Sequence, residues 1–309
     1  MESTAKILVT GGSGLVGMAL IAELKRAGHT PITPSHAQCD YENREATLTL
    51  FLQIKPDYVF HLAAKVGGIQ ANVKDPVGFF YVNSLINGHV LEACHRFEVK
   101  KVAQLGSGCV YPKDSPQPMK EEFILNGSLE PTNEGYALAK ISAMKLGQYY
   151  HSQYGLRVVC PIGSNIYGPG DTYDLDRAHV LSALVRRFSE AKEQNKKTIQ
   201  LWGTGAARRQ FVHVRDVARG LIFFMNNVES SEPINFGPKE DTSIRELAEL
   251  IAAEIGYKGE ITWDTTKPDG MLKKCLDITK LEALGFRTEI GLRDGIRDVI
   301  RDYDSKVKS

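Results

Sequence analysis

The chain opens with short apolar runs that alternate with longer amphipathic stretches. The apolar runs, rich in Val, Ile, Leu and aromatic residues, predict strands at Ala5–Thr10, Thr30–Thr33, Tyr58–Leu62, Lys101–Leu105 and Arg157–Pro161. The stretches between them predict helices at Leu15–Ala27, Arg44–Leu52, Phe79–Phe97 and Thr132–Tyr154. Such alternation is typical of an α/β fold with a Rossmann-type, doubly wound parallel sheet. We therefore expect a ligand crevice at the carboxyl ends of these strands.

The second half is less regular and predicts a smaller, mixed α/β part for substrate binding. Its helices are expected at Val180–Gln194, Asp216–Asn227, Ser243–Ile255 and Leu292–Asp304, with strands near Ile199–Trp202 and Phe211–Val214. The segment Asp216–Phe236 is expected to return to the main sheet. We thus assign residues 1–174 with 206–236 to the Rossmann domain and residues 175–205 with 237–309 to the smaller one.

Composition narrows the class of protein. The 309 residues are 42% hydrophobic and 24% charged, as in globular proteins, and the net charge of +1 gives no general attraction to nucleic acid or membrane. Five cysteines without CxxC or Cys/His spacing predict neither a disulfide framework nor a metal site. No apolar run approaches the ~20 residues that span a bilayer. These features favour the reducing cytoplasm.

A glycine motif lies where the first strand meets the first helix. Gly11, Gly14 and Gly17 have the spacing GxxGxxG, and Leu15 and Val16 open the helix. In dinucleotide-binding folds these glycines allow the tight turn, the approach of the pyrophosphate and the packing of helix on strand. A glycine-rich turn without a ligand is the alternative, which the preceding strand and following helix disfavour.

The end of the second predicted strand bears on the cofactor. NAD enzymes usually carry an acid there, but this chain reads Thr-Pro-Ser-His up to His36, and the first acid is Asp40. The missing acid favours NADP(H), with His36 as a donor to the 2′-phosphate and Asp40 near the adenine. An ordinary loop histidine is an equally good interpretation of His36.

Three residues have the spacing of a carbonyl-reducing site. Tyr136 and Lys140 are four apart on a predicted helix and so share one face. We expect the Lys140 ammonium to lower the pKa of Tyr136, which would exchange a proton with a substrate carbonyl. Tyr-xxx-Lys alone is common by chance. Ser107, however, follows the strand Lys101–Leu105 and completes the acid/base set of a short-chain dehydrogenase.

Longer motifs carry a closer resemblance, which covers nearly the whole chain. The sequence resembles the GDP-L-fucose synthase family of extended short-chain dehydrogenases/reductases. The matching stretches are Ala63–Ile69, Gly106–Lys113, Leu129–Glu134 and Asn165–Pro169, together with His179, Arg187, Trp202 and Arg209.

The resemblance implies a bifunctional epimerase-reductase that converts GDP-4-keto-6-deoxy-D-mannose to GDP-L-fucose with NADPH. It implies inversion at C3 and C5, with Cys109 as base and His179 as acid, followed by reduction of the C4 ketone. A cysteine or histidine can have a pKa near neutrality, as these proton transfers require. Ser107 and Tyr136 would stabilise the enolate and then serve the reduction.

The resemblance also assigns binding residues and an assembly. Further contacts to NADP(H) are expected from Ala63, Lys140, Asn165 and His179. The residues expected to bind the GDP-sugar are Lys65, Ser107, Gly108, Cys109, Asn165, Arg187, Trp202, Arg209 and Asp277. Lys274 resembles a late substrate-contacting position, although Lys273 and Lys274 are also read as surface charges. A homodimer is expected through the helices near Asn83–Phe97 and Thr132–Tyr154.

Several alternatives stay open. Gly108 replaces the small hydroxyl residue of many family members, which keeps a related C4-reductase or epimerase-reductase on another GDP-4-keto-deoxy sugar, of a heptose or colitose route, in play. A UDP-sugar epimerase with retained NAD and a non-catalytic NADP sensor are further alternatives. Cys109 taken alone suits a small core residue, and His179 a helix cap.

Overall fold

The larger part of the protein is built on a parallel sheet. The computed structural model describes residues 1–175, 177–267 and 269–307. The strands follow the order β1-β2-β3-β5-β10, and β4 joins the sheet beside β5. Their bounds are β1 (Ile7–Thr10), β2 (Tyr58–His61), β3 (Lys101–Gln104), β4 (Gly106–Ser107), β5 (Arg157–Gly163) and β10 (Pro233–Phe236).

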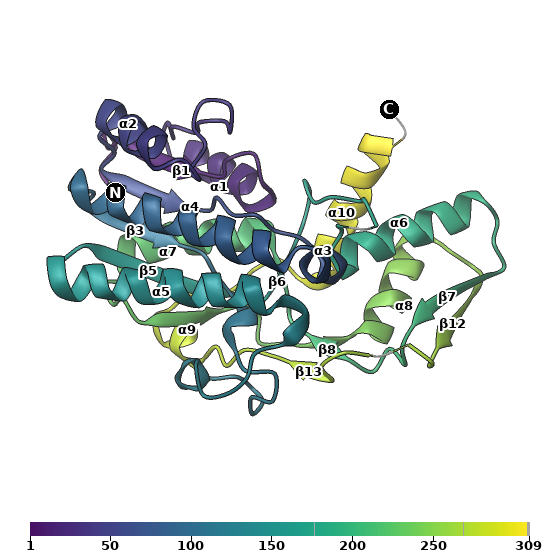
Figure 1. The fold of residues 1–309 in the computed structure, drawn as a ribbon. Coiled ribbons are helices and arrows are strands. Elements are labelled where there is room, and N and C mark those ends of the chain that lie inside the picture. The colour runs from purple at the N-terminus through teal and green to yellow at the C-terminus, as the bar shows by residue number, and fades with distance from the viewer. Residues whose placement is uncertain (176, 268, 308–309) are drawn as a thin grey trace.

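Helices cover both faces of this sheet (Figure 1). On one face, α1 (Leu15–Arg26) and α7 (Val214–Asn227) pack against each other and enclose a core with β1, β2 and β10. On the other, α2 (Arg44–Ile54), α4 (Pro76–Arg96) and α5 (Glu134–Tyr154) enclose a second core. The doubly wound α/β fold expected from the sequence is therefore confirmed, and β10 returns to the sheet by pairing with β5.

One predicted strand, Thr30–Thr33, is not a strand in the structure. A single bridge joins Ile32 to Leu8: the Ile32 amide donates to Ile7 O at 2.7 Å, and Ile32 O accepts from the Val9 amide at 2.9 Å. The next amide of such a ladder belongs to Pro34, which has no N–H to donate. The chain therefore runs beside β1 at one point only.

The smaller part combines three helices with short sheets. Helices α6 (Val180–Glu193), α8 (Ile244–Ile255) and α10 (Leu292–Val307) share a core with the paired strands β7 (Thr198–Trp202) and β12 (Glu260–Asp264). A three-stranded sheet has the order β11-β8-β13, and β6 pairs with β9. Their bounds are β6 (Asn165–Tyr167), β8 (Arg208–Arg209), β9 (Phe211–His213), β11 (Thr242–Ser243) and β13 (Lys273–Lys274).

Most predicted elements end within a few residues of the observed ones, and the unpredicted elements are short. They include α3 (Ile69–Lys74), α9 (Thr279–Ala283) and the 3₁₀ turns η1 (Gly108–Val110), η2 (Glu121–Phe123) and η3 (Pro131–Asn133). Leu281 of α9 and the following Phe286 pack into the core of the larger part. The segment thus packs with the larger part, whereas β6, β8 and β9, which lie within the residues expected in the Rossmann domain, are described here with the smaller part. The expected division of the chain stays a prediction. Over the described residues, no helix is both long and apolar enough to cross a membrane.

Candidate active site

The glycine loop is shaped by close backbone contacts. Gly11 has φ +70°, and a Cβ there would lie 2.7 Å from the Ala63 nitrogen. A Cβ on Gly17 would lie 2.2 Å from Gly11 O, whereas one on Gly14 would lie 3.4 Å from the same atom. Gly14 is the N-cap of α1, which has no side-chain cap and no acid in its first turn, where Leu15 and Val16 lie. The free amides and the helix dipole there suit a phosphate.

A cavity of about 410 Å³ adjoins this loop. Its wall includes the expected residues Gly11, His36, Asp40 and Ala63. It also includes Tyr41, which the sequence did not single out and whose buried hydroxyl has no partner among the described residues. An unpartnered buried hydroxyl is costly, so this cavity is suited to a polar ligand such as the adenosine half of a dinucleotide.

A buried polar chain connects the glycine loop to the catalytic helix. Thr10 Oγ1 lies 2.9 Å from His61 Nδ1, and His61 Nε2 lies 3.0 Å from Asn87 Oδ1. Since the Asn87 oxygen only accepts, His61 carries its proton on Nε2 and accepts from the Thr10 hydroxyl. Asn87 in turn donates to Ala139 O on α5 at 3.4 Å. Burial lowers the pKa of His61 to about 4, so the ring is neutral.

The predicted catalytic residues meet where β3 and β4 end. Ser107 ends β4, and its Oγ accepts the Cys109 amide at 3.5 Å. On α5, Lys140 Nζ donates to Leu105 O at 2.9 Å and lies 5.7 Å from the centre of the Tyr136 ring. Tyr136 packs against the hydrophobic cluster that contains Cys109. The structure thus brings together the serine, cysteine, tyrosine and lysine that the sequence predicted.

The protonation states differ from those expected. Burial raises the pKa of Tyr136, and burial lowers the pKa of Lys140. The expectation that Lys140 lowers the pKa of Tyr136 is therefore wrong for this structure, in which burial and then the nearby Cys109 raise that pKa. Tyr136 stays protonated at neutral pH, which suits a proton donor.

The same holds for the thiol. Cys109 is buried, and burial raises its pKa, so the expectation of a pKa near neutrality is also wrong for this structure. The Lys274 ammonium is the foremost group that opposes this rise, followed by the hydrogen bond with Ser107 and by Lys140. A Cβ on Gly108 would lie 3.7 Å from Lys274 Cε, which places this lysine beside the catalytic turn.

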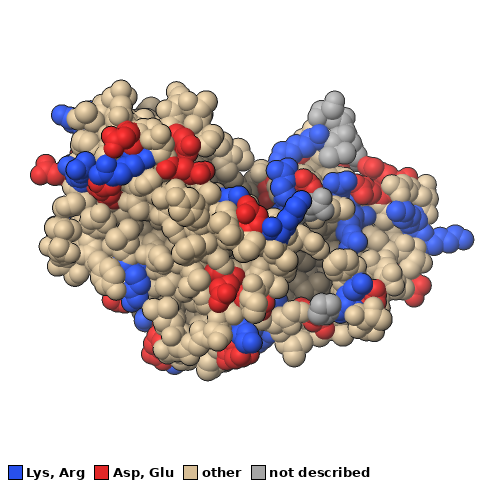
Figure 2. All heavy atoms as spheres, in the orientation of Figure 1, with Lys and Arg blue, Asp and Glu red and all other residues tan. Residues whose placement is uncertain are grey.

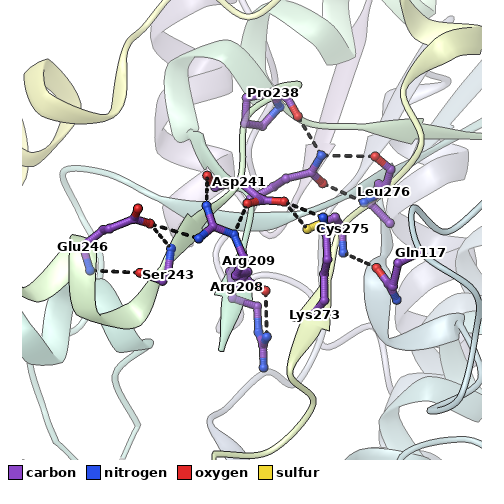
Figure 3. A network of polar contacts seen from close by, with 11 residues as sticks. Gln117, Arg208, Arg209, Pro238, Asp241, Ser243, Glu246, Lys273, Cys275 and Leu276 are labelled. Atoms are coloured by element: carbon purple, nitrogen blue, oxygen red, sulfur yellow. Dashed lines mark hydrogen bonds and ion pairs between the residues drawn. The ribbon is translucent and has the colours of Figure 1, made fainter. Parts of the chain in front are cut away.

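A polar network beside the turn contains Arg208, Arg209 and Lys273 (Figure 3), and Lys274 follows Lys273 on the same strand. In the parallel pair of β8 and β13, Arg208 lies opposite Lys273 and Arg209 opposite Lys274. Arg208 and Lys273 both form ion pairs with Asp241, at 3.0 Å for Lys273, and these cations hold the pKa of Asp241 down at about 2 despite its partial burial. Neighbouring residues of a strand point to opposite faces, so Arg209 and Lys274 point away from this carboxylate.

Arg187 and Arg209, two of the arginines predicted to bind the substrate, have no acidic partner among the described residues. Burial lowers the pKa of Arg209, whose side chain donates to Arg208 O at 2.8 Å. No ion pair of Arg209, of Lys274 or of the half-buried Arg187 on α6 occurs within the described residues. In the space-filling view, the surface is hollowed between the two parts, with Lys and Arg beside the hollow (Figure 2). Half-buried cations without acids suit an anionic ligand such as a diphosphate.

Other predicted residues have protein partners. Lys65 Nζ donates to Asp75 at 2.6 Å, and Asn165 Nδ2 donates to Gln210 O at 2.9 Å. Trp202 ends β7 with 60% of its surface exposed, and Lys267 lies 5.9 Å from its ring centre. His179 is exposed and is the N-cap residue of α6. Its ring makes no capping hydrogen bond, so its side chain does not cap the helix.

Asp277, expected to bind the substrate, has a local partner, and a second acid, Asp269, lies beside Trp202. The Asp277 carboxylate accepts the Thr279 amide at 2.9 Å at the start of α9, which is a turn-forming role. The carboxylate next to the Trp202 end of β7 is Asp269, which accepts the amide and hydroxyl of Thr204, each at 2.7 Å. No cluster of three or more metal-ligating side chains occurs among the described residues.

Comparisons with known proteins agree with this geometry. The model of the NAD dependent epimerase/dehydratase family matches residues 7–237. The chain is 42% identical to GDP-L-fucose synthase 1 of Arabidopsis thaliana, over 100% of this chain and 95% of that protein. A solved GDP-6-OMe-4-keto-L-xylo-heptose reductase from C. jejuni has a TM-score of 0.93 and 30% identity, and 99% of each chain is covered.

A further solved structure contains a cofactor. It is a GDP-L-fucose synthetase from Naegleria fowleri bound to NADP, with a TM-score of 0.90, 28% identity and coverage of 100% of this chain and 97% of that one. The resemblance expected from the sequence is thus confirmed over the full length, and the chain belongs to the NAD dependent epimerase/dehydratase family.

Proposed function

We propose that this protein is a bifunctional epimerase-reductase that makes GDP-L-fucose from GDP-4-keto-6-deoxy-D-mannose with NADPH. The observation that supports it best is the convergence of Cys109 with Ser107, Tyr136 and Lys140 at the carboxyl ends of β3 and β4. A reductase alone requires the serine, tyrosine and lysine. The cysteine at the same place adds a base for carbons next to the ketone, and the sequence similarity to GDP-L-fucose synthases supports that role.

The proposed reaction uses one carbonyl-binding site twice. Cys109, as thiolate, removes a proton from the carbon beside the C4 ketone, and the resulting enolate oxygen accepts hydrogen bonds from Ser107 and Tyr136. His179 returns a proton to the opposite face, which inverts the carbon. When bound, NADPH supplies the hydride for C4. Tyr136, protonated in this structure, then donates its proton to the C4 oxygen as the alcohol forms.

The cofactor fits the residues present. The amides at the start of α1 would bind the pyrophosphate. Gly11 and Gly17 carry no side chains, and the backbone around them is too close to accept a Cβ. The cavity with the unpartnered Tyr41 hydroxyl suits the adenosine, with His36 and Asp40 on its wall. We expect NADPH to be preferred to NADH. Comparable catalytic efficiency with both would contradict the assignment of His36 to the 2′-phosphate.

The nucleotide half of the substrate is assigned to the smaller part. Arg187 and Arg209, without acidic partners in the described part of the chain, suit the diphosphate, and the exposed Trp202 ring suits the guanine face. We leave Asp277 out of the proposed substrate set because its carboxylate already accepts the Thr279 amide. Asp269, beside Trp202, accepts both the amide and the hydroxyl of Thr204 and is left out for the same reason.

A related reductase for another GDP-4-keto-deoxy sugar is the second candidate. Gly108 favours it, because the catalytic turn lacks the hydroxyl that many GDP-L-fucose synthases carry there. The similarity to the C. jejuni heptose reductase over the full chain also supports it. Product identification separates the two candidates.

The test is product analysis by NMR in heavy water with NADPH and the keto sugar. The full protein is expected to incorporate deuterium at C3 and C5 and to form GDP-L-fucose. Cys109→Ser should lose the deuterium incorporation while some NADPH oxidation continues, since serine is a far weaker base. Tyr136→Phe should reduce the ketone at least ~100-fold more slowly. Normal exchange and product formation by Cys109→Ser would remove the cysteine from this role.

We also propose a homodimer of a cytoplasmic enzyme. Val77, Phe80 and Tyr81 of α4 and Leu138 and Tyr149 of α5 are large exposed apolar side chains on the two helices expected to pair. All five cysteines are free thiols, which suits a reducing compartment. Light scattering on the purified protein tests the assembly: a monomer at micromolar concentration contradicts it.

A further inference from the structure

Lys274 is a half-buried cation that the proposed reaction does not use. It lies on β13, opposite Arg209 of β8, and its Cε approaches to within 3.7 Å of a Cβ placed on Gly108. Within the described residues it has no carboxylate at ion-pair distance, whereas its neighbour Lys273 pairs with Asp241 at 3.0 Å. A desolvated ammonium without an acid is costly, so its position beside the catalytic turn calls for a negative partner there.

The titratable groups around Cys109 indicate that the thiolate of this cysteine is the partner. Lys140 and Tyr136 face the thiol from α5, and Lys274 faces it from β13. Lys140 is already held by Leu105 O at 2.9 Å. Lys274 is itself faced by Arg209, which lowers its pKa, and by Glu130 and Cys109, which raise it, while burial lowers it most. Ionisation of Cys109 would therefore relieve the buried ammonium, and the ammonium would stabilise the thiolate.

We propose that Lys274 activates Cys109: its ammonium, held beside the Gly108–Val110 turn by β13, stabilises the thiolate that removes the substrate proton. The inference rests on the proposed function for the role of the thiolate, but the interaction of the two groups is a property of the protein alone. In the proton-transfer step the thiolate takes H⁺ from carbon, which leaves a neutral thiol and an enolate, and Lys274 keeps its proton throughout.

The alternation of side chains along β13 positions this lysine. Asp241 holds Lys273 and Arg208 on one face of the small sheet, and Cys275 is fixed through its amide to Gln117 Oε1 at 2.9 Å (Figure 3). Lys274 lies between these two anchored residues. Its direction toward the catalytic turn therefore follows from strand alternation rather than from a contact of its own.

The test titrates the thiol without any sugar substrate. Alkylation of Cys109 by iodoacetamide is followed by mass spectrometry of its peptide from pH 7 to 11.5 in the unmodified protein, Lys274→Gln and Lys274→Arg. Lys273→Gln is the matched control, since it removes a neighbouring charge that faces Asp241. An opposite charge at close range shifts a pKa by about one unit or more, so the midpoint for Lys274→Gln is expected to rise by at least ~1 pH unit. At pH 7 a rise of one unit leaves ~10-fold less thiolate, but a thiolate of higher pKa is a better nucleophile. The alkylation rate of Lys274→Gln should therefore fall ~3-fold or more.

Lys274→Arg and Lys273→Gln are expected to keep the original midpoint. If the reagent is too slow to reach the thiol, the ultraviolet absorbance of the thiolate, measured against Cys109→Ser as blank, gives the same midpoint. An unchanged midpoint in folded Lys274→Gln overturns the proposal. If the KM for the GDP-sugar rises in that variant instead, Lys274 serves the diphosphate. Failure to form GDP-L-fucose would count against the proposed function and would leave the titration result standing.

Discussion

The two parts of the molecule prepare for their ligands in different ways. Around the glycine loop, backbone atoms are so close that a Cβ on Gly17 would lie 2.2 Å from Gly11 O, and the buried Thr10–His61–Asn87 chain is neutral. In the smaller part, Arg187 and Arg209 have no acids within the described residues. Close backbone packing and internal hydrogen bonds thus determine the form of the proposed cofactor site. The proposed substrate site instead contains positive charges whose partner would be an anionic ligand.

The largest effect is expected from a substitution that disturbs the close backbone packing of the glycine loop. Gly17→Ala forces its methyl group against Gly11 O, which should lower the free energy of unfolding by ~1–3 kcal/mol. Loss of two charge-assisted phosphate contacts should weaken NADPH binding on the order of 100-fold. Thermal unfolding and cofactor titration measure both. The control is Gly14→Ala, whose Cβ has 3.4 Å to the same oxygen and whose thermal stability should stay close to normal.

The neutrality of the buried chain predicts a pH dependence of stability. Burial lowers the pKa of His61 from 6.5 to about 4, so between these values the unfolded chain binds a proton that the folded protein does not. Stability from this group is therefore complete above pH 6.5 and falls as the pH drops toward 4, by at most ~3 kcal/mol. Denaturant unfolding at pH 7 and pH 4.5 measures it. His61→Gln, although less stable at pH 7, should show a flatter dependence; an equal slope would assign the effect to other groups.

Removing a positive charge from the proposed substrate site should weaken binding of the GDP-sugar and leave binding of NADPH unchanged. Arg209→Met keeps the length of the side chain but not its donors, and one charge-assisted hydrogen bond contributes ~1.5–3 kcal/mol. The KM for the GDP-sugar should rise ~10- to 100-fold, with the KM for NADPH and the thermal stability nearly unchanged. Steady-state kinetics with each substrate varied in turn checks this split. Equal rises in both KM values would mean that the two parts are not separable in this way.

The smallest effect is expected at Gly108. A Cβ there would meet Gly163 O at 3.6 Å, Lys274 at 3.7 Å and Leu276 at 3.9 Å, which are ordinary van der Waals distances. Gly108→Ser should therefore change the free energy of unfolding by less than ~1 kcal/mol. The added hydroxyl should alter the ratio of activities toward GDP-4-keto sugars, measured by competition between two of them. A folded variant with an unchanged ratio would show that position 108 does not select the sugar.

The sequence located most elements of both parts, but it missed the short strands β6, β8, β11, β12 and β13 of the smaller part. Apolar runs and helical spacing located the main strands and helices, since each buries a continuous face whose pattern is local. The strand Thr30–Thr33 was wrong, although Pro31 and Pro34 were visible in the sequence as residues unable to donate to a ladder. The two prolines therefore indicate that pairing with β1 stops at Ile32.

In the site, residue identities were predictable but their protonation was not. Ser107, Tyr136 and Lys140 follow from motif spacing, whereas the raised pKa values of Tyr136 and Cys109 depend on burial by distant segments. The position of Lys274 beside Gly108 also depends on pairing between β8 and β13, which are far apart in the sequence. Tyr41 and Asp269 carried no motif, and only the cavity and the Thr204 contact single them out.

The register between β8 and β13 has a consequence for how this segment can change. Each strand has two residues. Arg208 and Lys273 point toward Asp241, and Arg209 and Lys274 point away from it. Both members of each pair are cations, so a single substitution leaves the alternation intact. A slip of β13 by one residue along β8 would instead reverse the faces of that strand, turning Lys273 toward the catalytic turn and Lys274 toward Asp241. The contacts that fix the register of β13, such as the hydrogen bond from the Cys275 amide to Gln117, should therefore matter more than the identity of any one of these cations.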